Sequence, residues 1–148
     1  MAHPLIPSIK HGFMAYRNGI VADTLRKAGY PHRVIFGLQL PQISEIFRTL
    51  PPEGAACEAE GGAPLDRHAL GLELWADREV RESRLLAAYL LDPARLSVDE
   101  SLALAADTRT PEEADILVFR TLRHHPCARE IAGLLSGAPR AALDRFLS

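Results

Sequence analysis

The chain has 148 residues, 47% of them hydrophobic and 24% charged, which is enough for one domain with a sizeable core. It contains no run of about 18 apolar residues and no basic-then-apolar N-terminal segment, so we expect neither a membrane span nor a secretory signal. The formal net charge of −2 is not that of a strongly basic nucleic-acid-binding domain. The charge is uneven, because residues 1–50 sum to +4, residues 51–100 to −6, and residues 101–148 to zero.

The first fifty residues are expected to form helices that cap the rest of the chain. Apolar residues recur at helical spacing over Ile9–Lys27, which predicts a helix that stops at Gly29. The stretch His32–Leu40 has the composition of a strand, but no second strand is evident, so we interpret it as a turn. A second helix is predicted over Pro41–Leu50, with its proline in the first turn. The following segment, 51–63, is rich in Gly, Ala and Glu and is predicted to be a mobile loop.

Residues 64–148 show a succession of helical segments separated by two to five residues. Two of them have explicit start signals, a capping box of Ser97 with Glu100 and the pair Thr110-Pro111 as N-cap and first helical residue. Such short connections predict that consecutive helices pack as antiparallel hairpins, and the fold class is all-α. The predicted segments are Pro64–Ala76, Val80–Leu91, Ser97–Ala106, Pro111–Leu122, Ala128–Ser136 and Pro139–Leu147.

An internal repeat with an offset of 45 residues indicates the architecture. A period near 45 built on helix pairs is typical of HEAT and armadillo solenoids, so we predict a short α-α superhelix of HEAT-like repeats. The whole chain, 1–148, would be one such domain, with cap helices in 1–50 and stacked repeats in 64–148. The identical pairs are Ala69/Ala114, Leu72/Leu117, Arg78/Arg123, Arg84/Arg129, Ala87/Ala132 and Leu90/Leu135.

The repeated arginines have two interpretations. Arg78, Arg84, Arg123 and Arg129 could form a ladder of phosphate-binding groups on the concave face of a solenoid. Alternatively, they pair with nearby acids or cap the C-terminal ends of helices. Arg120 and Arg123, with His124-His125, form a further basic cluster, whose histidines are expected to be solvated or capping.

The cysteines and histidines do not suggest a metal or redox site. Cys57 and Cys127 form no spaced disulfide framework, which favours a reducing cytoplasm as the compartment, and no Cys-x-x-Cys pair, which argues against a zinc or redox site. The adjacent histidines, His124 and His125, would point about 100° apart on a helix, which does not suit metal ligation. Phosphate-binding, hydrolase and metalloprotease motifs are also missing, so we expect no metal and no cofactor.

One segment resembles a known family. Residues 72–93, LELWADREVRESRLLAAYLLDP, resemble a stretch of the AlkD-like DNA alkylation repair family, which commonly has an LW, a short acidic turn, an E-x-[RK]-x-L-A run and then DP. Upstream, Phe36-Gly37 with Pro41 and Ile46 is similar to the family's F-G…P…I pattern. The resemblance is good over about 66–100, moderate over 33–50 and weaker after Asp107. It implies a solenoid of HEAT-like repeats whose concave basic face cradles duplex DNA, as in relatives that excise alkylated purines.

The resemblance also implies one catalytic residue. The family's site uses a W-D-x-x-D stretch whose last Asp would stabilise the positive charge that develops on the sugar. An ungapped alignment on Asp92-Pro93 places Asp115 at that key position and Glu112 at the first Asp. Pro111 stands where the family has an aromatic residue that contacts DNA, and the family's other site residues lie on repeats beyond this chain.

The sequence therefore leaves several functions open. The first is an AlkD-like HEAT-repeat protein that binds double-stranded DNA through its backbone, with glycosylase activity reduced or absent. The predicted DNA contacts are Arg78, Arg84, Arg120, Arg123 and Arg129. The alternative is a protein-interaction scaffold with no role on DNA. A third hypothesis is a working glycosylase for alkylated purines that depends on Asp115. No interaction with a membrane is expected, and the sequence does not determine the oligomeric state.

Overall fold

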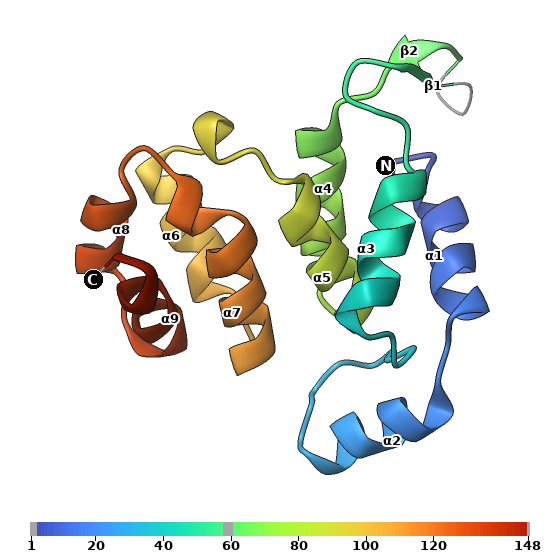
Figure 1. The fold of residues 1–148 in the computed structure, drawn as a ribbon, viewed down its shortest axis with the longest axis horizontal. Coiled ribbons are helices and arrows are strands. Elements are labelled where there is room, and N and C mark those ends of the chain that lie inside the picture. The colour runs from blue at the N-terminus through green and yellow to red at the C-terminus, as the bar shows by residue number, and fades with distance from the viewer. Residues whose placement is uncertain (1–2, 58–60, 148) are drawn as a thin grey trace. The chain divides into compact units, whose positions relative to one another are not determined.

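Helices make up most of the computed structural model, which describes residues 3–57 and 61–147 (Figure 1). The chain divides into two compact units, residues 1–90 and 91–148, and each is described by itself. Unit 1 contains α1 (Ile6–Ala15), α2 (Gly19–Lys27), α3 (Leu40–Thr49), α4 (Arg67–Ala76) and α5 (Arg81–Leu90). None of the helices in the described ranges is long and apolar enough to cross a membrane.

The helix predicted over Ile9–Lys27 is wrong, because two helices, α1 and α2, occupy this range. Asn18 lies between them in an extended conformation, and its side chain accepts hydrogen bonds from the backbone N–H groups of Ile20 (3.1 Å) and Val21 (3.2 Å). This N-cap starts a new helix within a continuous apolar pattern. The predicted stop at Gly29 is confirmed, since α2 ends at Lys27 and Gly29 has a φ of +96°.

Helix α5 lies at the centre of unit 1. It contacts both α4 and α3, and every residue from 81 to 88 is buried. Fully buried apolar side chains from four helices complete the core, among them Phe13, Ile43, Leu74 and Leu85. The short connection between α4 and α5 gives the helix hairpin that the sequence predicted here.

The segment predicted as a turn, His32–Leu40, is extended and lies against the start of α5. Val34 forms a parallel β-bridge with Val80, in which the Val34 N–H donates to the Glu79 carbonyl (2.9 Å) and the Arg81 N–H donates to the Val34 carbonyl (3.2 Å). Gly37 in this segment has a φ of +87°, and a Cβ there would lie 2.2 Å from the backbone oxygen of Asn18. The strand-like composition therefore reflects real pairing, with a partner 46 residues away in the sequence.

The predicted loop 51–63 contains a small β-structure, so the prediction of an all-α chain is corrected at this point. Strand β1 (Ala56–Cys57) pairs antiparallel with β2 (Ala63–Pro64), with Ala56 opposite Pro64 and Cys57 opposite Ala63 (Figure 1). Residues 58–60 of the predicted loop lie outside the described residues. Apart from this hairpin and the bridged segment before α3, the regular elements of the described residues are helices, as predicted.

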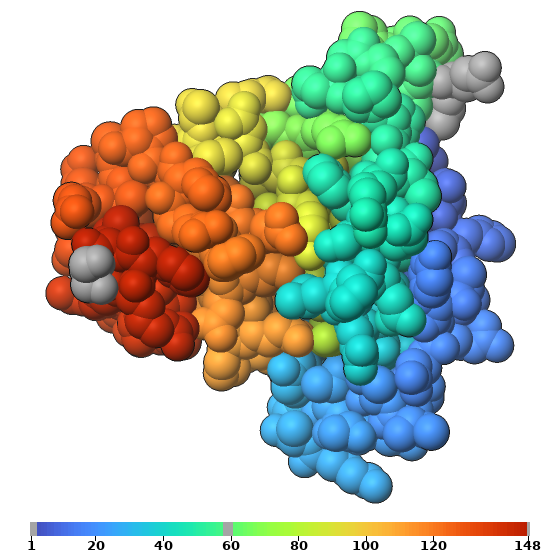
Figure 2. Space-filling view, in the orientation of Figure 1, coloured from blue at the N-terminus to red at the C-terminus, as the bar shows by residue number. Residues whose placement is uncertain are grey.

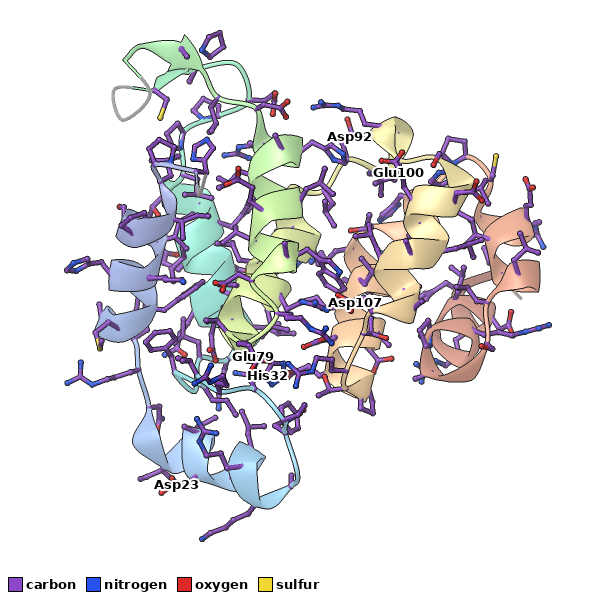
Figure 3. The ribbon with its side chains drawn as sticks, turned by 180° about the vertical axis from the view of Figure 1, so that it is seen from behind. Asp23, His32, Glu79, Asp92, Glu100 and Asp107 are labelled. Carbon is purple, nitrogen blue, oxygen red and sulfur yellow. The ribbon has the colours of Figure 1, made fainter. Side chains whose placement is uncertain are left out.

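Unit 2 consists of short helices whose starts follow the sequence signals. Its elements are the 3-10 turn η2 (Pro93–Arg95), α6 (Val98–Ala106), α7 (Pro111–Arg120), the 3-10 turn η3 (Leu122–His124), α8 (Ala128–Leu134) and α9 (Gly137–Leu147). The capping box is confirmed, because Ser97 and Glu100 exchange two hydrogen bonds of 3.0 Å at the start of α6. Figure 3 labels Glu100 in the first turn of this helix. The Thr110 side chain accepts from the Glu113 N–H (3.1 Å) and caps α7, as predicted.

Packing in unit 2 mainly joins helices that are next but one in the chain. The most extensive helix–helix contact joins α7 to α9, and α6 packs on α8, while α8 also contacts α9. Helices α6 and α8 begin at Val98 and Ala128, about 30 residues apart. Consecutive helices are therefore not the main partners here, unlike the predicted series of hairpins.

In the first helix of each predicted repeat, residues that correspond at the 45-residue offset differ in their burial. Ala69 and Leu72 are exposed on α4, whereas their counterparts Ala114 and Leu117 are fully buried on α7. In the second helix, the pairs at 87/132 and 90/135 are buried in both copies. The predicted array of 45-residue repeats remains a prediction.

Candidate nucleic-acid interface

The five arginines predicted to contact DNA lie in different environments and in both units. In unit 1, Arg78 is exposed in the turn between α4 and α5, and Arg84 is fully buried in α5. In unit 2, Arg120 is exposed at the end of α7, Arg123 is half-buried in η3, and Arg129 is exposed on α8. Three of the five predicted residues, Arg120, Arg123 and Arg129, thus lie in unit 2.

Arg84 has a structural role in the core of unit 1. Its guanidinium lies 4.3 Å from the centroid of the Trp75 ring, and both side chains are buried. A cation stacked on an indole face gains stabilisation from the ring quadrupole, more strongly when water is excluded. Because Arg84 has no exposed surface, we leave it out of the interface. Trp75, the one tryptophan of the sequence, is buried in α4.

In unit 2, the contact between α7 and α9 brings two phenylalanines and two arginines together on the surface. We call Phe119, Arg120, Arg123 and Phe146 the aromatic–arginine cluster. The two phenyl centroids are 5.8 Å apart, at an interplanar angle of 57°, and each Phe is 42% exposed. Figure 2 shows α9 (red) at the surface of unit 2. The rings meet because Phe119 occupies the last turn of α7 and Phe146 the last turn of α9.

Arg123 is the most tightly held cation of this cluster. Its guanidinium carbon lies 4.1 Å from the Phe119 centroid and 5.1 Å from that of Phe146, and its Nε donates to the Phe119 carbonyl (2.7 Å). The Arg120 guanidinium lies 5.6 Å from the same Phe119 ring. Within residues 3–57 and 61–147, Nε is the only nitrogen of the Arg123 guanidinium that is hydrogen-bonded. Its two terminal NH₂ groups remain for a ligand.

The predicted catalytic residue, Asp115, lies one helical turn before Phe119 and forms a surface ion pair. Its Oδ1 is 3.0 Å from Arg145 Nη2, and the two side chains are 57% and 66% exposed. Two further acidic residues, Glu112 and Glu113, lie in the first turn of α7. Glu113 is fully buried and accepts from the Arg109 N–H (3.0 Å), while Glu112 is half-buried in the first turn. Asp115 therefore lies on an open surface with its negative charge already compensated.

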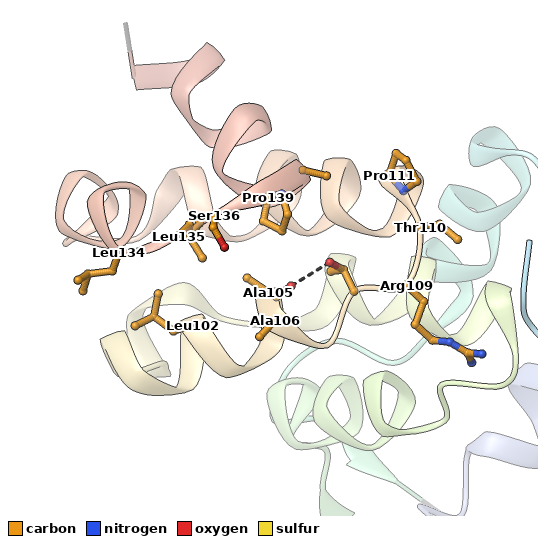
Figure 4. Close-up of a pocket in the computed structure, with 12 residues that line it drawn as sticks. Leu102, Ala105, Ala106, Arg109, Thr110, Pro111, Leu134, Leu135, Ser136 and Pro139 are labelled. Atoms are coloured by element: carbon orange, nitrogen blue, oxygen red, sulfur yellow. Dashed lines mark hydrogen bonds between the residues drawn. The ribbon is translucent and has the colours of Figure 1, made fainter.

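A groove of about 560 Å³ lies elsewhere in unit 2 (Figure 4). The end of α6, the start of α7 and the turn before α9 line it, and a hydrogen bond from Thr108 Oγ1 to the Ala105 carbonyl (2.8 Å) closes one side. Its described lining is mostly apolar, with Arg109, Thr108, Thr110 and Ser136 as polar residues, and includes no carboxylate, histidine or cysteine. Asp115 is not part of this lining, so the groove offers no acid for base excision.

The histidines and cysteines are structural or isolated where the structure describes them. His124 is exposed, in line with the solvated alternative of the prediction, whereas His125 is buried and bonds the backbone at the N-cap of α8, in line with the capping alternative. Its Nδ1 accepts from the Cys127 N–H (2.9 Å) and its Nε2 is 2.7 Å from the Leu96 carbonyl. Cys57 and Cys127 are both free thiols. In the described ranges, no group of three potential metal ligands occurs.

Sequence reasoning missed the two phenylalanines of the cluster. At the 45-residue offset Phe119 corresponds to Leu74, but Leu74 is fully buried while Phe119 is 42% exposed. A local signal exists, because Asp115, Phe119 and Arg123 follow one another at four-residue spacing on a single stripe. The contribution of Phe146 has no local signal, since it comes from a separate helix.

No protein-family model, curated protein or solved structure matches this chain. The resemblance to the AlkD-like family thus depends on the residues of 33–50 and 66–100 alone.

Proposed function

We propose that this protein is an AlkD-like, HEAT-type helical protein that binds double-stranded DNA through its phosphate backbone, with glycosylase activity reduced or absent. The observation that carries the proposal is Arg123, whose guanidinium is fixed against two phenyl rings while both terminal NH₂ groups face no described partner. Arg120 and the exposed His124 lie next to it in the sequence, so the same end of unit 2 provides further donors.

The chemistry of Arg123 suits a phosphate ligand. A guanidinium presents planar, paired N–H donors that match two phosphate oxygens, and such charge-assisted bonds are among the stronger hydrogen bonds in proteins. Arg123 is already oriented by its stacking and by the bond from Nε, so binding costs little additional side-chain entropy. The net charge of −2 gives the chain as a whole no electrostatic attraction for DNA. Binding would therefore depend on this local arrangement of Arg123.

The HEAT-like part of the proposal is supported by packing within unit 2. In such solenoids each helix pair buries its inner face by stacking on the next pair, so first helices contact first helices and second helices contact second helices. The contacts of α6 with α8 and of α7 with α9 follow this pattern. The resemblance over residues 72–93 is a separate, sequence-based support.

The reduced or absent glycosylase activity follows from the surroundings of Asp115. A carboxylate that stabilises a developing cation should face the reacting sugar in a site that excludes water, where charge interactions are stronger. Asp115 is instead exposed and compensated by Arg145, and Pro111 stands in place of the aromatic residue. We therefore assign the cluster to binding and not to base excision.

A fluorescence anisotropy titration of a labelled 20-base-pair duplex, repeated at several salt concentrations, tests the proposal. We expect saturable binding at low salt that weakens steeply with added salt, because each contacted phosphate releases counterions. Arg120→Gln and Arg123→Gln should each reduce the slope of log K against log salt by about one. Arg48→Gln is the matched control, because it removes an exposed arginine of α3 that pairs with Glu45.

Two outcomes would overturn the assignment. The first is no duplex binding by the wild-type protein at low salt. The second is an equal effect of Arg123→Gln and Arg48→Gln, which would show that only net charge matters. Base release is measured on an N-methylated duplex. If the wild-type protein releases the methylated base and Asp115→Asn does not, the proposal of reduced or absent glycosylase activity is contradicted.

A protein-interaction scaffold is the second candidate, and exposed apolar side chains favour it. Phe119 and Phe146 are each 42% exposed, and their ring centroids are 5.8 Å apart. Large exposed apolar groups that lie together often mark protein interfaces. The test is a nuclease-treated pull-down with wild-type protein and Phe146→Ser as baits. A stoichiometric protein that only the wild type retains, without duplex binding, would replace the DNA proposal.

A further inference from the structure

We propose that Phe119 and Phe146 stack an unpaired base, so that the protein prefers DNA with an unstacked nucleotide to fully paired DNA. This inference rests on the proposed function, because Arg120 and Arg123 are taken to contact the neighbouring phosphates. It assigns a ligand to the two phenyl rings. Binding to the phosphate backbone of a duplex does not involve these rings.

The exposure of the two rings is the first observation. Each phenyl leaves 42% of its surface open although the rings contact each other, with their centroids 5.8 Å apart. Phosphate and deoxyribose oxygens gain nothing from an apolar ring face, whereas every nucleobase has a π-face that stacks on an aromatic side chain. A duplex holds its bases in its own stack, so only an unpaired base reaches such rings.

The guanidinium of Arg123 is the second observation. It lies over both rings, at 4.1 Å from Phe119 and 5.1 Å from Phe146, and extends their apolar surface with a flat cation. Arginine planes stack on nucleobases as aromatic rings do, and the same group donates to phosphate. One nucleotide combines a flat base with an adjacent anion, which is the combination that this cluster presents.

Charge decides between a nucleic acid and a protein as the occupant. Arg120, Arg123 and His124 lie together at the C-terminal end of α7 and in η3, and the nearby acid, Asp115, is compensated by Arg145. An interface for a neutral apolar protein surface would have to desolvate the Arg123 guanidinium, whose terminal NH₂ groups have no hydrogen-bond partner among the described residues, which is costly. An anionic ligand pairs with them, so the nucleotide is the occupant that we propose.

The test compares two labelled duplexes of equal length, one fully paired and one with a single bulged thymidine in the centre. Wild-type protein should bind the bulged duplex at least about fivefold tighter, in line with the affinity that one base–aromatic stack supplies. Phe146→Leu, which keeps an apolar side chain but removes the ring face, should abolish this preference for the bulged duplex over the paired one. Phe47→Leu is the matched control, because Phe47 in unit 1 contacts Tyr89 and Arg67 in a similar way.

The outcomes separate this inference from the proposed function. Equal affinity of wild-type protein for both duplexes overturns the stacking proposal and leaves duplex binding intact. If Phe146→Leu still prefers the bulged duplex, the stacking proposal is also overturned, because the preference would then not depend on the Phe146 ring. Absence of binding to either duplex refutes the proposed function, and capture of a protein partner by the same rings replaces it. The wild-type comparison needs no variant to fold.

Discussion

The buried carboxylate of Glu82 joins the extended segment 34–38 to the start of α5, and its removal should destabilise unit 1. Glu82 is fully buried, and its Oε1 accepts from the Phe36 N–H (3.0 Å). Its Oε2 accepts from the Gly37 N–H (3.1 Å) and from Arg81 Nη1 (2.6 Å). Arg81, itself only 4% exposed, also donates to the Leu38 carbonyl (2.9 Å). A single carboxylate therefore satisfies three donors away from water.

The variant Glu82→Gln keeps the shape but replaces one oxygen by an NH₂ group and removes the charge. If the remaining oxygen faces Gly37 and Arg81, the new NH₂ points at the Phe36 N–H, and two donors oppose each other. An unsatisfied buried donor costs about 1–3 kcal/mol, and the loss of the buried ion pair between Arg81 and Glu82 adds to this, so we expect a total loss of about 3–5 kcal/mol.

Urea unfolding followed by tryptophan fluorescence measures this loss. The sequence has one tryptophan, Trp75, and it is buried in α4 of the same unit, so the signal reports on unit 1. Glu45→Gln is the control. It breaks an exposed ion pair with Arg48 (3.0 Å) and should cost less than about 0.5 kcal/mol. If Glu82→Gln lowers the unfolding free energy by no more than Glu45→Gln does, the assignment of a stabilising buried clasp is refuted.

Three further predictions address stability and are measured by circular dichroism during urea unfolding. His125→Ala should cost about 2–3 kcal/mol, because it removes both buried hydrogen bonds of the ring, while His124→Ala should change little, and equal effects would contradict this role. Gly37→Ala should destabilise more than Gly54→Ala, since both glycines have positive φ but only at Gly37 does a Cβ meet backbone; similar losses would exclude the close approach. Gly133→Ala on α8 faces open space and should stabilise by about 0.5–1 kcal/mol, and a loss would argue against that exposure.

The beginnings and ends of several helices could be predicted because the interactions that set them are local. Ser97 and Glu100 are three residues apart, and Thr110 caps a residue three positions later, so the sequence shows both partners of each cap. Gly29 follows the same logic, since its positive φ is a property of one residue. The break between α1 and α2 also has a local signal, the N-cap residue Asn18. It was not predicted because the apolar periodicity continues through Asn18.

The extended segment before α3 could not be predicted from its own residues. Val34 lies in a segment with the composition of a strand, but its partner is Val80. Helices α3 and α4 lie between the two residues in the sequence. A β-bridge requires hydrogen bonds between two distant backbones, and no local period reports which backbones meet. The small hairpin of β1 and β2 was also missed, although its two strands, Ala56–Cys57 and Ala63–Pro64, are close together in the sequence.

The candidate site shows the same division between local and tertiary information. The sequence by itself determined that Arg120, Arg123 and His124 gather at one helix end, because they are neighbours along the chain. It also placed Asp115 on the same helix, four residues before Phe119. Only the tertiary structure decided that Arg84 is buried on Trp75 and that Arg123 is held between rings from two helices. Periodicity shows that a helix has a face, but the packing of α7 on α9 determines what that face contacts, and therefore which arginines remain available to a ligand.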